Sequence, residues 1–279
     1  MSANANAAGH RSLTKPLWAD DLSGALKLHR DATSGEVSIA DLQPETRANL
    51  PFPRNGTALA INYLRLGVAA DLPRSSGRGG ARNHADRESH ALSIAQVANL
   101  KAASAHASAI GLPFTRMITI HWEAAGLPLG RMAHATGRFT DLLSKAVARH
   151  GSTTAWLWTH ENGDRKGGHC HLLAHVPAAL VPRLTGLQRG WLGRIAGRPY
   201  RARVIHSRPI GGRLGLEAGN PELHAANLRT ALLYVVKGAS PAAASELDLA
   251  RLEPGGRVIG KRCGTSQNIG AKARRLGGE

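Results

Sequence analysis

Two histidines separated by a single residue, His169 and His171, are the side chains in this sequence best suited to chemistry. They belong to segment 167–177, which begins with two glycines, alternates between imidazoles and apolar side chains, and ends in a proline. Alternation with a period of two is typical of a half-buried β-strand, so both imidazoles would project from one face. Two neutral imidazoles side by side can supply half of the ligands of a divalent metal ion.

Tyr234 and Lys237 form a second reactive pair near the end of a predicted helix, residues 221–237. Asn220 is a suitable N-cap for this helix and Pro221 is favoured at its first position. Residues three apart on a helix are neighbours. A phenolate can attack phosphorus and form a covalent phosphotyrosine, and the lysine could favour the phenolate, hold a phosphate, or both. Lys237 could also be an ordinary cation at a helix C-terminus.

The elements that must position these residues are predicted in the order strand, helix, strand, strand, helix, strand. Their predicted ranges are 116–122, 129–150, 153–159, 169–176, 178–195 and 201–207. The polar segment 160–168 would be the turn of a central hairpin. This order is that of a split βαβ unit and predicts an α+β fold, a ferredoxin-like or RRM-like antiparallel sheet with helices on one face. The helix with Tyr234 would follow as a C-terminal catalytic helix.

Composition divides the chain into three parts. Residues 1–90 are rich in small, polar and charged residues and are predicted to be an accessory or partly disordered arm. Residues 91–242 contain the periodic segments and would be the catalytic domain. Residues 243–279 would be a basic C-terminal tail.

The charge of the protein points to a polyanionic partner. The formal net charge is +17 and the sequence pI is about 11.2, which is typical of nucleic-acid binding. The C-terminal cluster would bind phosphates without reading base sequence. Its members are Arg257, Lys261, Arg262, Lys272, Arg274 and Arg275.

Several other classes of protein are disfavoured by composition. No apolar run approaches the ~20 residues that a membrane span needs, and the N-terminus lacks the apolar core of a signal peptide. The two cysteines, Cys170 and Cys263, form neither a disulfide framework nor a CxxC motif. A cytoplasmic protein without membrane contact is expected.

The chain resembles the HUH endonuclease superfamily on two motifs. His169-Cys170-His171 is similar to the His-hydrophobic-His signature, and Tyr234-Val235-Val236-Lys237 is similar to the YxxK signature that follows it in single-tyrosine rolling-circle replication initiators. The resemblance covers roughly residues 114 to 240. It implies metal-dependent nicking and joining of single-stranded DNA through a 5′-phosphotyrosine, with Mg²⁺ or Mn²⁺ held by His169 and His171 and with Tyr234 and Lys237 as catalytic residues.

The resemblance also implies a third metal ligand on a neighbouring strand. Glu161 is the first candidate, because it precedes the turn and a carboxylate suits a hard cation. His160 has the opposite side-chain parity, so a shift of one residue in strand register would substitute it. His121, on the polar face of the first strand, is a further alternative.

A replication initiator of a plasmid, phage or mobile element is the form of this chemistry that the resemblance implies, acting on a single-stranded origin or hairpin. No GxxxxGK[ST] phosphate loop is present, so unwinding would depend on a host helicase. A single-tyrosine transposase with the same chemistry remains open. The alternative from another class is a non-catalytic nucleic-acid-binding domain with a ferredoxin-like sheet.

Overall fold

The structure is a computed structural model that describes residues 87–164 and 166–276. The predicted N-terminal arm therefore falls outside the described residues, apart from residues 87–90. The strands are β1 (Glu88–Ser89), β2 (Arg116–His121), β3 (Trp156–Gly163), β4 (Gly167–Ala174), β5 (Ile205–Pro209), β6 (Val258–Ile259) and β7 (Cys263–Thr265). The α-helices are α3 (Ile94–Ala109), α4 (Met132–Ala148), α5 (Val181–Ala196), α6 (Leu216–Gly219), α7 (Pro221–Val235), α8 (Pro241–Glu246) and α9 (Ala271–Leu276). Short 3-10 turns are η3 (Leu129–Arg131), η4 (Ala178–Leu180) and η5 (Gln267–Ile269).

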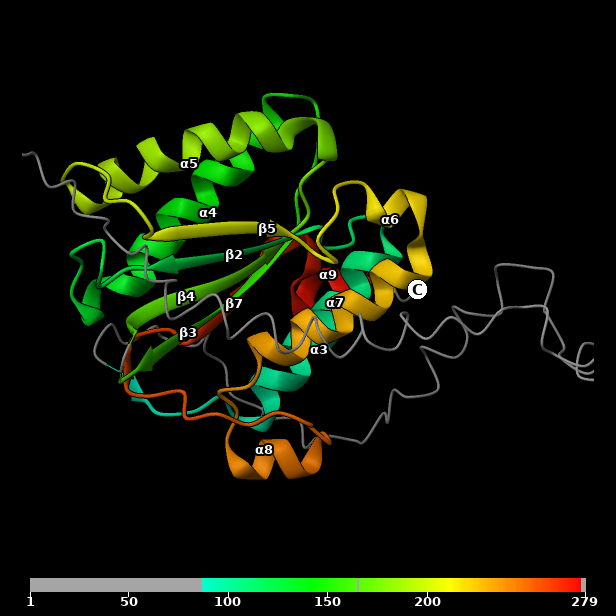
Figure 1. Cartoon of the computed structure of the whole chain (residues 1–279). Coiled ribbons are helices and arrows are strands. Elements are labelled where there is room, and N and C mark those ends of the chain that lie inside the picture. Colours follow the sequence, from blue (N-terminus) through cyan, green and yellow to red (C-terminus); the bar gives the residue numbers. More distant parts are fainter. Residues whose placement is uncertain (1–86, 165, 277–279) are drawn as a thin grey trace, which may run out of the picture. The chain divides into compact units, whose positions relative to one another are not determined.

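The described part of the chain has an α+β fold built on one antiparallel sheet of five strands. The strands lie in the order β5-β2-β4-β3-β7, and every neighbouring pair is antiparallel. Figure 1 shows this sheet in the centre, with helices on both sides. The predicted order of strands and helices between residues 114 and 210 is the order that the structure has, from β2 to β5.

The central hairpin is longer than predicted. Strand β3 continues to Gly163, and only residues 164–166 separate it from β4. His160 and Glu161, which were expected in the turn, are therefore strand residues and pair with Cys170 and His169. Their opposite parity sends these two side chains to opposite faces of the sheet.

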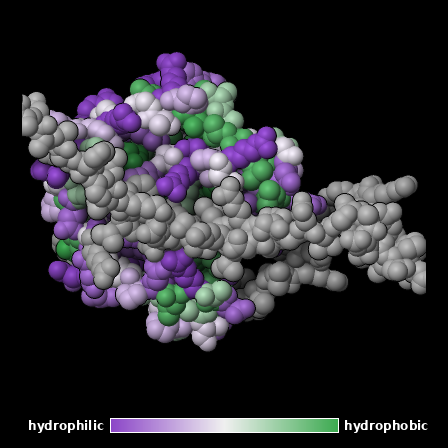
Figure 2. Space-filling model, viewed as in Figure 1, coloured by the Kyte–Doolittle hydropathy of each residue, from purple (hydrophilic) through white to green (hydrophobic). Residues whose placement is uncertain are grey.

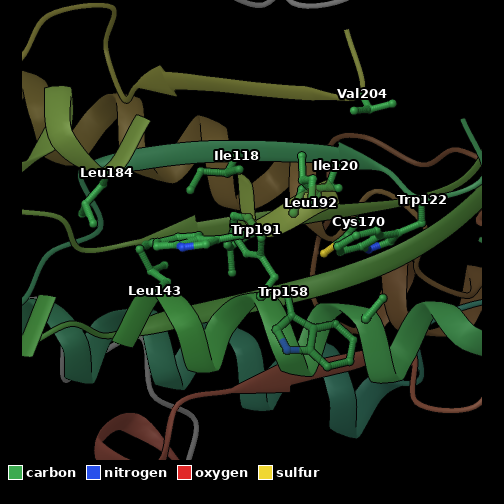
Figure 3. Packing of buried hydrophobic residues seen from close by; sticks show 14 of the residues in the cluster. Ile118, Ile120, Trp122, Leu143, Trp158, Cys170, Leu184, Trp191, Leu192 and Val204 are labelled. Atoms are coloured by element: carbon green, nitrogen blue, oxygen red, sulfur yellow. The ribbon is translucent and has the colours of Figure 1, made fainter. Parts of the chain in front are cut away.

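One face of the sheet packs against α4 and α5 and is sealed by apolar side chains. Ile118, Ile120, Cys170 and Leu172 point to this face and pack among aromatic and aliphatic residues of the two helices. Figure 3 shows Ile118, Ile120 and Cys170 of the sheet in this cluster with Trp191 of α5. Burying this much apolar surface is the main force that holds α4 and α5 on the sheet.

The opposite face packs against α3 and α7. Leu157 and Leu173 of the sheet contact a second buried cluster that includes Leu100 of α3 and Leu228 and Val235 of α7. We expected helices on one face of the sheet only. This holds for the crossover helices α4 and α5, but α3 and α7 cover the other face. The physical reason is that Leu157 and Leu173, at one end of β3 and β4, point to this second face. Their apolar side chains must also be buried, and α3 and α7 bury them.

Local sequence explains where α7 begins and ends. The side chain of Asn220 accepts a hydrogen bond from the backbone N–H of Leu223, and Pro221 occupies the first turn. His224 anchors the helix to the sheet region, because its Nε2–H donates to the carbonyl of Phe114. The helix ends at Val235, two residues earlier than predicted, so that Lys237 lies just beyond its last turn.

The C-terminal segment 243–279, expected to be a basic tail, takes part in this domain over its described residues. Strand β7 adds a fifth strand to the sheet through its pairing with β3. Cys263 and Ile269 are buried in the cluster with α3 and α7. Sequence periodicity did not indicate this because β7 spans only three residues.

Candidate functional site

Glu161, His169 and His171 form one compact group on the face of the sheet that α7 covers. One ligand atom from each residue lies within 4.8 Å of the other two, and all three side chains are buried. Glu161 on β3 is directly opposite His169 on β4, and His171 lies two residues further along the same strand face. Glu161, the first of the three candidates for the third ligand, thus lies with the two histidines.

Hydrogen bonds fix the direction of both imidazoles. Nδ1–H of His169 donates to the carbonyl of Gly167 at 2.8 Å, which leaves the lone pair on Nε2, 3.4 Å from Oε2 of Glu161. Nδ1 of His171 is hydrogen-bonded to the hydroxyl of Thr119 at 3.0 Å, and its Nε2 lies 3.5 Å from the same carboxylate oxygen. Such partners behind a histidine set the tautomer that a metal ligand requires.

The electrostatics favour the ligand forms of these groups. Burial by itself would raise the pKa of Glu161, but its contacts with His169 and His171 and the charge of Lys237 hold that pKa well below its usual range. Burial lowers the pKa of His171 to about 4. An ionised carboxylate and a neutral imidazole are therefore the forms present at neutral pH.

Two buried polar atoms of this group lack a hydrogen-bond partner among the described residues. They are Oε1 of Glu161 and Nε2 of His171. Buried polar atoms are rarely left without a partner, and two of them within one compact group are suited to binding a cation. Two imidazoles and a carboxylate are a donor set that divalent metals accept. This group could hold a metal ion.

Tyr234 and Lys237 lie beside this group. The ring of Tyr234 packs against the ring of His171, with centroids 5.0 Å apart and planes at 75°. Nζ of Lys237 lies 5.0 Å from the centroid of the tyrosine ring and contacts Oε2 of Glu161. Both residues are buried. Residues of the β3–β4 hairpin therefore meet residues at the end of α7 that lie more than sixty positions later in sequence.

These side chains line a pocket of about 170 Å³. Its walls are Glu161, Gly163, Lys166, His169, Tyr234, Lys237, Glu253 and Pro254. Sequence reasoning missed the contribution of residues 251–256, which we call the covering segment. Oε2 of Glu253 lies 3.4 Å from Nζ of Lys237, and the guanidinium carbon of Arg251 lies 5.0 Å from the ring centroid of Tyr234. No periodicity or motif in that segment signals its position, which depends on backbone pairing with Lys237.

His160, the first alternative ligand, does not belong to the group. It is fully buried on the face covered by α4, where its Nδ1–H donates to the carbonyl of Lys261 and its Nε2 accepts from the hydroxyl of Thr136. Its ring packs on that of Trp158 at 4.3 Å between centroids. The register β3–β4 that pairs Glu161 with His169 is what excludes His160.

His121, the other alternative, lies next to the group without joining it. It faces His169 across the β2–β4 pair, with ring centroids 5.5 Å apart, and stands 5.8 Å from His206 on its other side. Burial, with the charges of neighbouring histidines, lowers its pKa to about 3. The compact three-residue group contains Glu161 and does not include His121.

Arg262 must be removed from the predicted phosphate-binding cluster. Its guanidinium is buried and donates to the carbonyls of Ser89, His160, Gly255 and Gly256. Burial lowers its pKa to about 10. An arginine with this many backbone acceptors fastens segments together and cannot reach a nucleic acid.

The other members of that cluster differ in accessibility. Lys261, Lys272 and Arg275 are exposed. Arg257 is exposed and pairs with Glu88, whereas Arg274 is half-buried and donates to Asn99 and to a backbone carbonyl. On the face shown in Figure 2, hydrophilic residues predominate, with smaller hydrophobic areas between them. Among the described residues, no helix combines the length and apolar character of a membrane span.

Comparisons of the chain with protein-family models, with curated proteins and with solved structures found no match. The function of the pocket therefore has to be inferred from its own geometry and chemistry.

Proposed function

We propose that this protein nicks and joins single-stranded DNA through a covalent 5′-phosphotyrosine on Tyr234. The observation that carries the proposal is the contact between Tyr234 and His171, whose ring centroids are 5.0 Å apart. Tyr234 also lines one pocket with Glu161, His169 and Lys237. A nucleophile, a metal-binding group and a cation placed around one cavity are the parts that phosphoryl transfer to a side chain requires.

His169, His171 and Glu161 would hold Mg²⁺ or Mn²⁺. The carboxylate favours a hard cation, and the open positions left by three protein ligands suit a phosphate oxygen. When bound, the ion would supply Lewis-acid stabilisation of the charge that develops on the phosphate. The backbone carbonyl of Gly167 and the hydroxyl of Thr119 hold Nδ1 of the two imidazoles, so that each Nε2, which lies near Glu161, would be the atom that binds the ion.

Tyr234 would attack the scissile phosphorus through its phenolic oxygen. The bond between phosphorus and the 3′ oxygen breaks, and the departing 3′ hydroxyl receives the proton that the phenol loses. The product is a tyrosine joined to the 5′-phosphate, and the reverse attack by a 3′ hydroxyl restores a phosphodiester. Because the phosphotyrosine bond retains the energy of the broken phosphodiester bond, joining needs no nucleoside triphosphate.

Lys237 would place a positive charge beside the phenolate and the phosphate. Its Nζ stands 5.0 Å from the tyrosine ring centroid and is held between the carboxylates of Glu161 and Glu253. A fixed, buried cation stabilises developing negative charge more strongly than a solvated one. Burial and two carboxylate partners argue against the alternative of an ordinary cation at a helix end.

Replication initiation by a rolling-circle mechanism is the biological role that we propose. The HxH and YxxK motifs support it, as do strands β2, β3, β4 and β5 with α4 and α5, whose order fits a ferredoxin-like split βαβ unit. The net charge of +17 suits a single-stranded origin or hairpin as substrate. The protein would act in the cytoplasm with a host helicase. A transposase with the same chemistry would use the same pocket.

The test is a search for the covalent adduct. The full chain, Mn²⁺ and a pool of labelled single-stranded oligonucleotides should yield a protein–DNA adduct that peptide mapping assigns to Tyr234. Tyr234→Phe should abolish the adduct, and Tyr200→Phe is the matched control, because Tyr200 packs against the α4–α5 cluster away from the pocket. If the parent protein binds DNA but forms no adduct with Mn²⁺ or Mg²⁺, it is a nucleic-acid-binding domain instead.

A further inference from the structure

The covering segment 251–256 closes one side of the pocket that holds Tyr234. Glu253 and Pro254 are part of the pocket wall, although they lie beyond the helix and the motif that carry the tyrosine. Glu253 connects two cations, because its Oε2 lies 3.4 Å from Nζ of Lys237 while its Oε1 accepts from Nε of Arg251 at 2.7 Å. Glu253 thus links Arg251 of this segment to Lys237 of the pocket.

Backbone contacts hold the covering segment in place. The N–H of Glu253 donates to the carbonyl of Lys237 at 2.8 Å, and the N–H of Asn162 donates to the carbonyl of Gly255 at 3.0 Å. Gly256 has φ of +65°, and a Cβ there would lie 1.7 Å from the carbonyl oxygen of Asn162, so glycine is required. The buried guanidinium of Arg262 adds further bonds to this turn. These hydrogen bonds hold the backbone of the covering segment, to which Arg251 belongs, against Lys237 and β3.

Arg251 and Lys237 flank the same tyrosine ring at the same distance. The guanidinium carbon of Arg251 and Nζ of Lys237 each lie 5.0 Å from the ring centroid of Tyr234. The two cations differ in accessibility, since the side chain of Lys237 is 6% exposed and that of Arg251 is 32% exposed. Lys237 also contacts two carboxylates, Glu161 and Glu253, whereas the described ion pair of Arg251 is with Glu253 alone.

We propose that Arg251 is a catalytic residue that donates hydrogen bonds to a non-bridging oxygen of the phosphate attacked by Tyr234. This inference rests on the proposed function. A guanidinium is planar and offers several N–H donors in a fixed fork that matches phosphate oxygens, so it can serve a phosphate while one edge stays on Glu253. Arg251 transfers no proton, and its donors stabilise charge that grows on the phosphate as the tyrosine bond forms.

The competing interpretation is that Arg251 only stabilises the covering segment through its pair with Glu253. The chain offers a control in Lys145 of α4, whose Nζ donates to Oδ2 of Asp141 at 2.8 Å on the exposed surface. Lys145→Ala also removes an ion pair, but Lys145 belongs to α4 on the other face of the sheet, whereas Arg251 lies 5.0 Å from the ring centroid of Tyr234. If Arg251 acted only through Glu253, Arg251→Ala would lower the melting temperature and added guanidinium would not restore the rate.

The experiment measures the single-turnover rate of adduct formation at saturating oligonucleotide and Mn²⁺, with the full chain. Arg251→Ala should slow the step by roughly 100-fold or more, as the loss of one oxyanion donor does elsewhere. Arg251→Lys, which keeps the charge but not the fork, should recover part of the rate. Millimolar guanidinium should accelerate Arg251→Ala and leave Tyr234→Phe inactive. Lys145→Ala should stay within about twofold of the parent, because exposed ion pairs contribute little.

Three outcomes would overturn parts of this scheme in distinguishable ways. If the parent forms no adduct, the proposed function fails and the assignment of Arg251 fails with it. If Arg251→Ala forms the adduct at the parental rate, only the assignment of Arg251 fails. If Arg251→Ala is slow but shows a lowered melting temperature and no rescue by guanidinium, the residue is structural and the phosphate contact is refuted.

Discussion

Each face of the sheet contains a buried histidine, but the two histidines differ in how fully their ring nitrogens are hydrogen-bonded. On the α4 side, His160 is surrounded by apolar and hydroxyl groups, and both its ring nitrogens have partners in Thr136 and Lys261. On the α7 side, His171 has a partner for Nδ1 only, and its Nε2 faces Glu161. His160 and Glu161 are consecutive residues of β3, so one step along a strand separates a histidine with two hydrogen-bond partners from a candidate metal ligand.

The comparison shows that burial alone does not identify a functional histidine. His160 and His171 are both buried, and burial lowers both pKa values. The difference lies in whether the hydrogen-bonding capacity is satisfied within the protein. A satisfied network on one face contributes stability, whereas unsatisfied atoms on the other can bind an ion.

The largest effect is expected from removing a ligand on the α7 side. His171→Ala should weaken Mn²⁺ binding by more than about 100-fold and abolish adduct formation, because even partners behind a ligand are worth 10- to 100-fold. Isothermal titration calorimetry would measure the affinity, and chelation of the metal should reproduce the loss in the parent. His175→Ala is the control, since His175 lies near the same strand and donates to the carbonyl of Pro113. Parental metal affinity in His171→Ala would refute the ligand assignment.

The equivalent change on the α4 side should affect stability instead. His160→Ala removes a fully buried ring and leaves the hydroxyl of Thr136 and the carbonyl of Lys261 without their partner. We expect a loss of about 2–4 kcal/mol in the free energy of unfolding, measured by urea denaturation. The folded variant should bind Mn²⁺ with parental affinity. A selective loss of metal binding without loss of stability would mean that the two faces are not separate in function.

A smaller effect on metal affinity is expected from changing Thr119, whose hydroxyl is hydrogen-bonded to the candidate ligand His171. Thr119→Val keeps the shape of the side chain but removes the hydroxyl bonded to Nδ1 of His171. Metal affinity should fall by roughly 10- to 100-fold, with little change in the melting temperature. Thr154→Val is the control, because it removes a similar bond, to the carbonyl of His175, outside the pocket. Equal metal affinities for the two variants would show that Thr119 does not orient the ligand.

The smallest effect is a change in the pH dependence of stability. Burial lowers the pKa of His160 to about 3 in the folded protein, against an ordinary value of 6.5. Between these values the unfolded chain binds a proton that the folded chain does not, so stability is lost as pH falls from about 6.5 toward 3. In His160→Gln the slope of unfolding free energy against pH should be shallower by up to about 1.4 kcal/mol per pH unit. Identical slopes near pH 5 would contradict a neutral His160.

Sequence periodicity predicted the central elements because their patterns are strong. The alternation around His169 and His171 and the capping residues of α7 each carry a local physical signal. The choice between Glu161 and His160 had no such signal, because it depends on strand register. The end of β3 was also predicted too early, since polar residues such as Glu161 and Asn162 continue the strand only because β4 pairs with them.

What the sequence by itself determined is the list of reactive residues, their placement on a strand and a helix, and the basic character of the chain. Tertiary structure alone decided which carboxylate meets the histidines, that Arg262 is buried, and that Arg251 and Glu253 lie beside Tyr234. The reason is physical: secondary structure follows from neighbours along the chain, whereas register, burial of a long side chain and closure of a pocket depend on contacts between segments far apart in sequence.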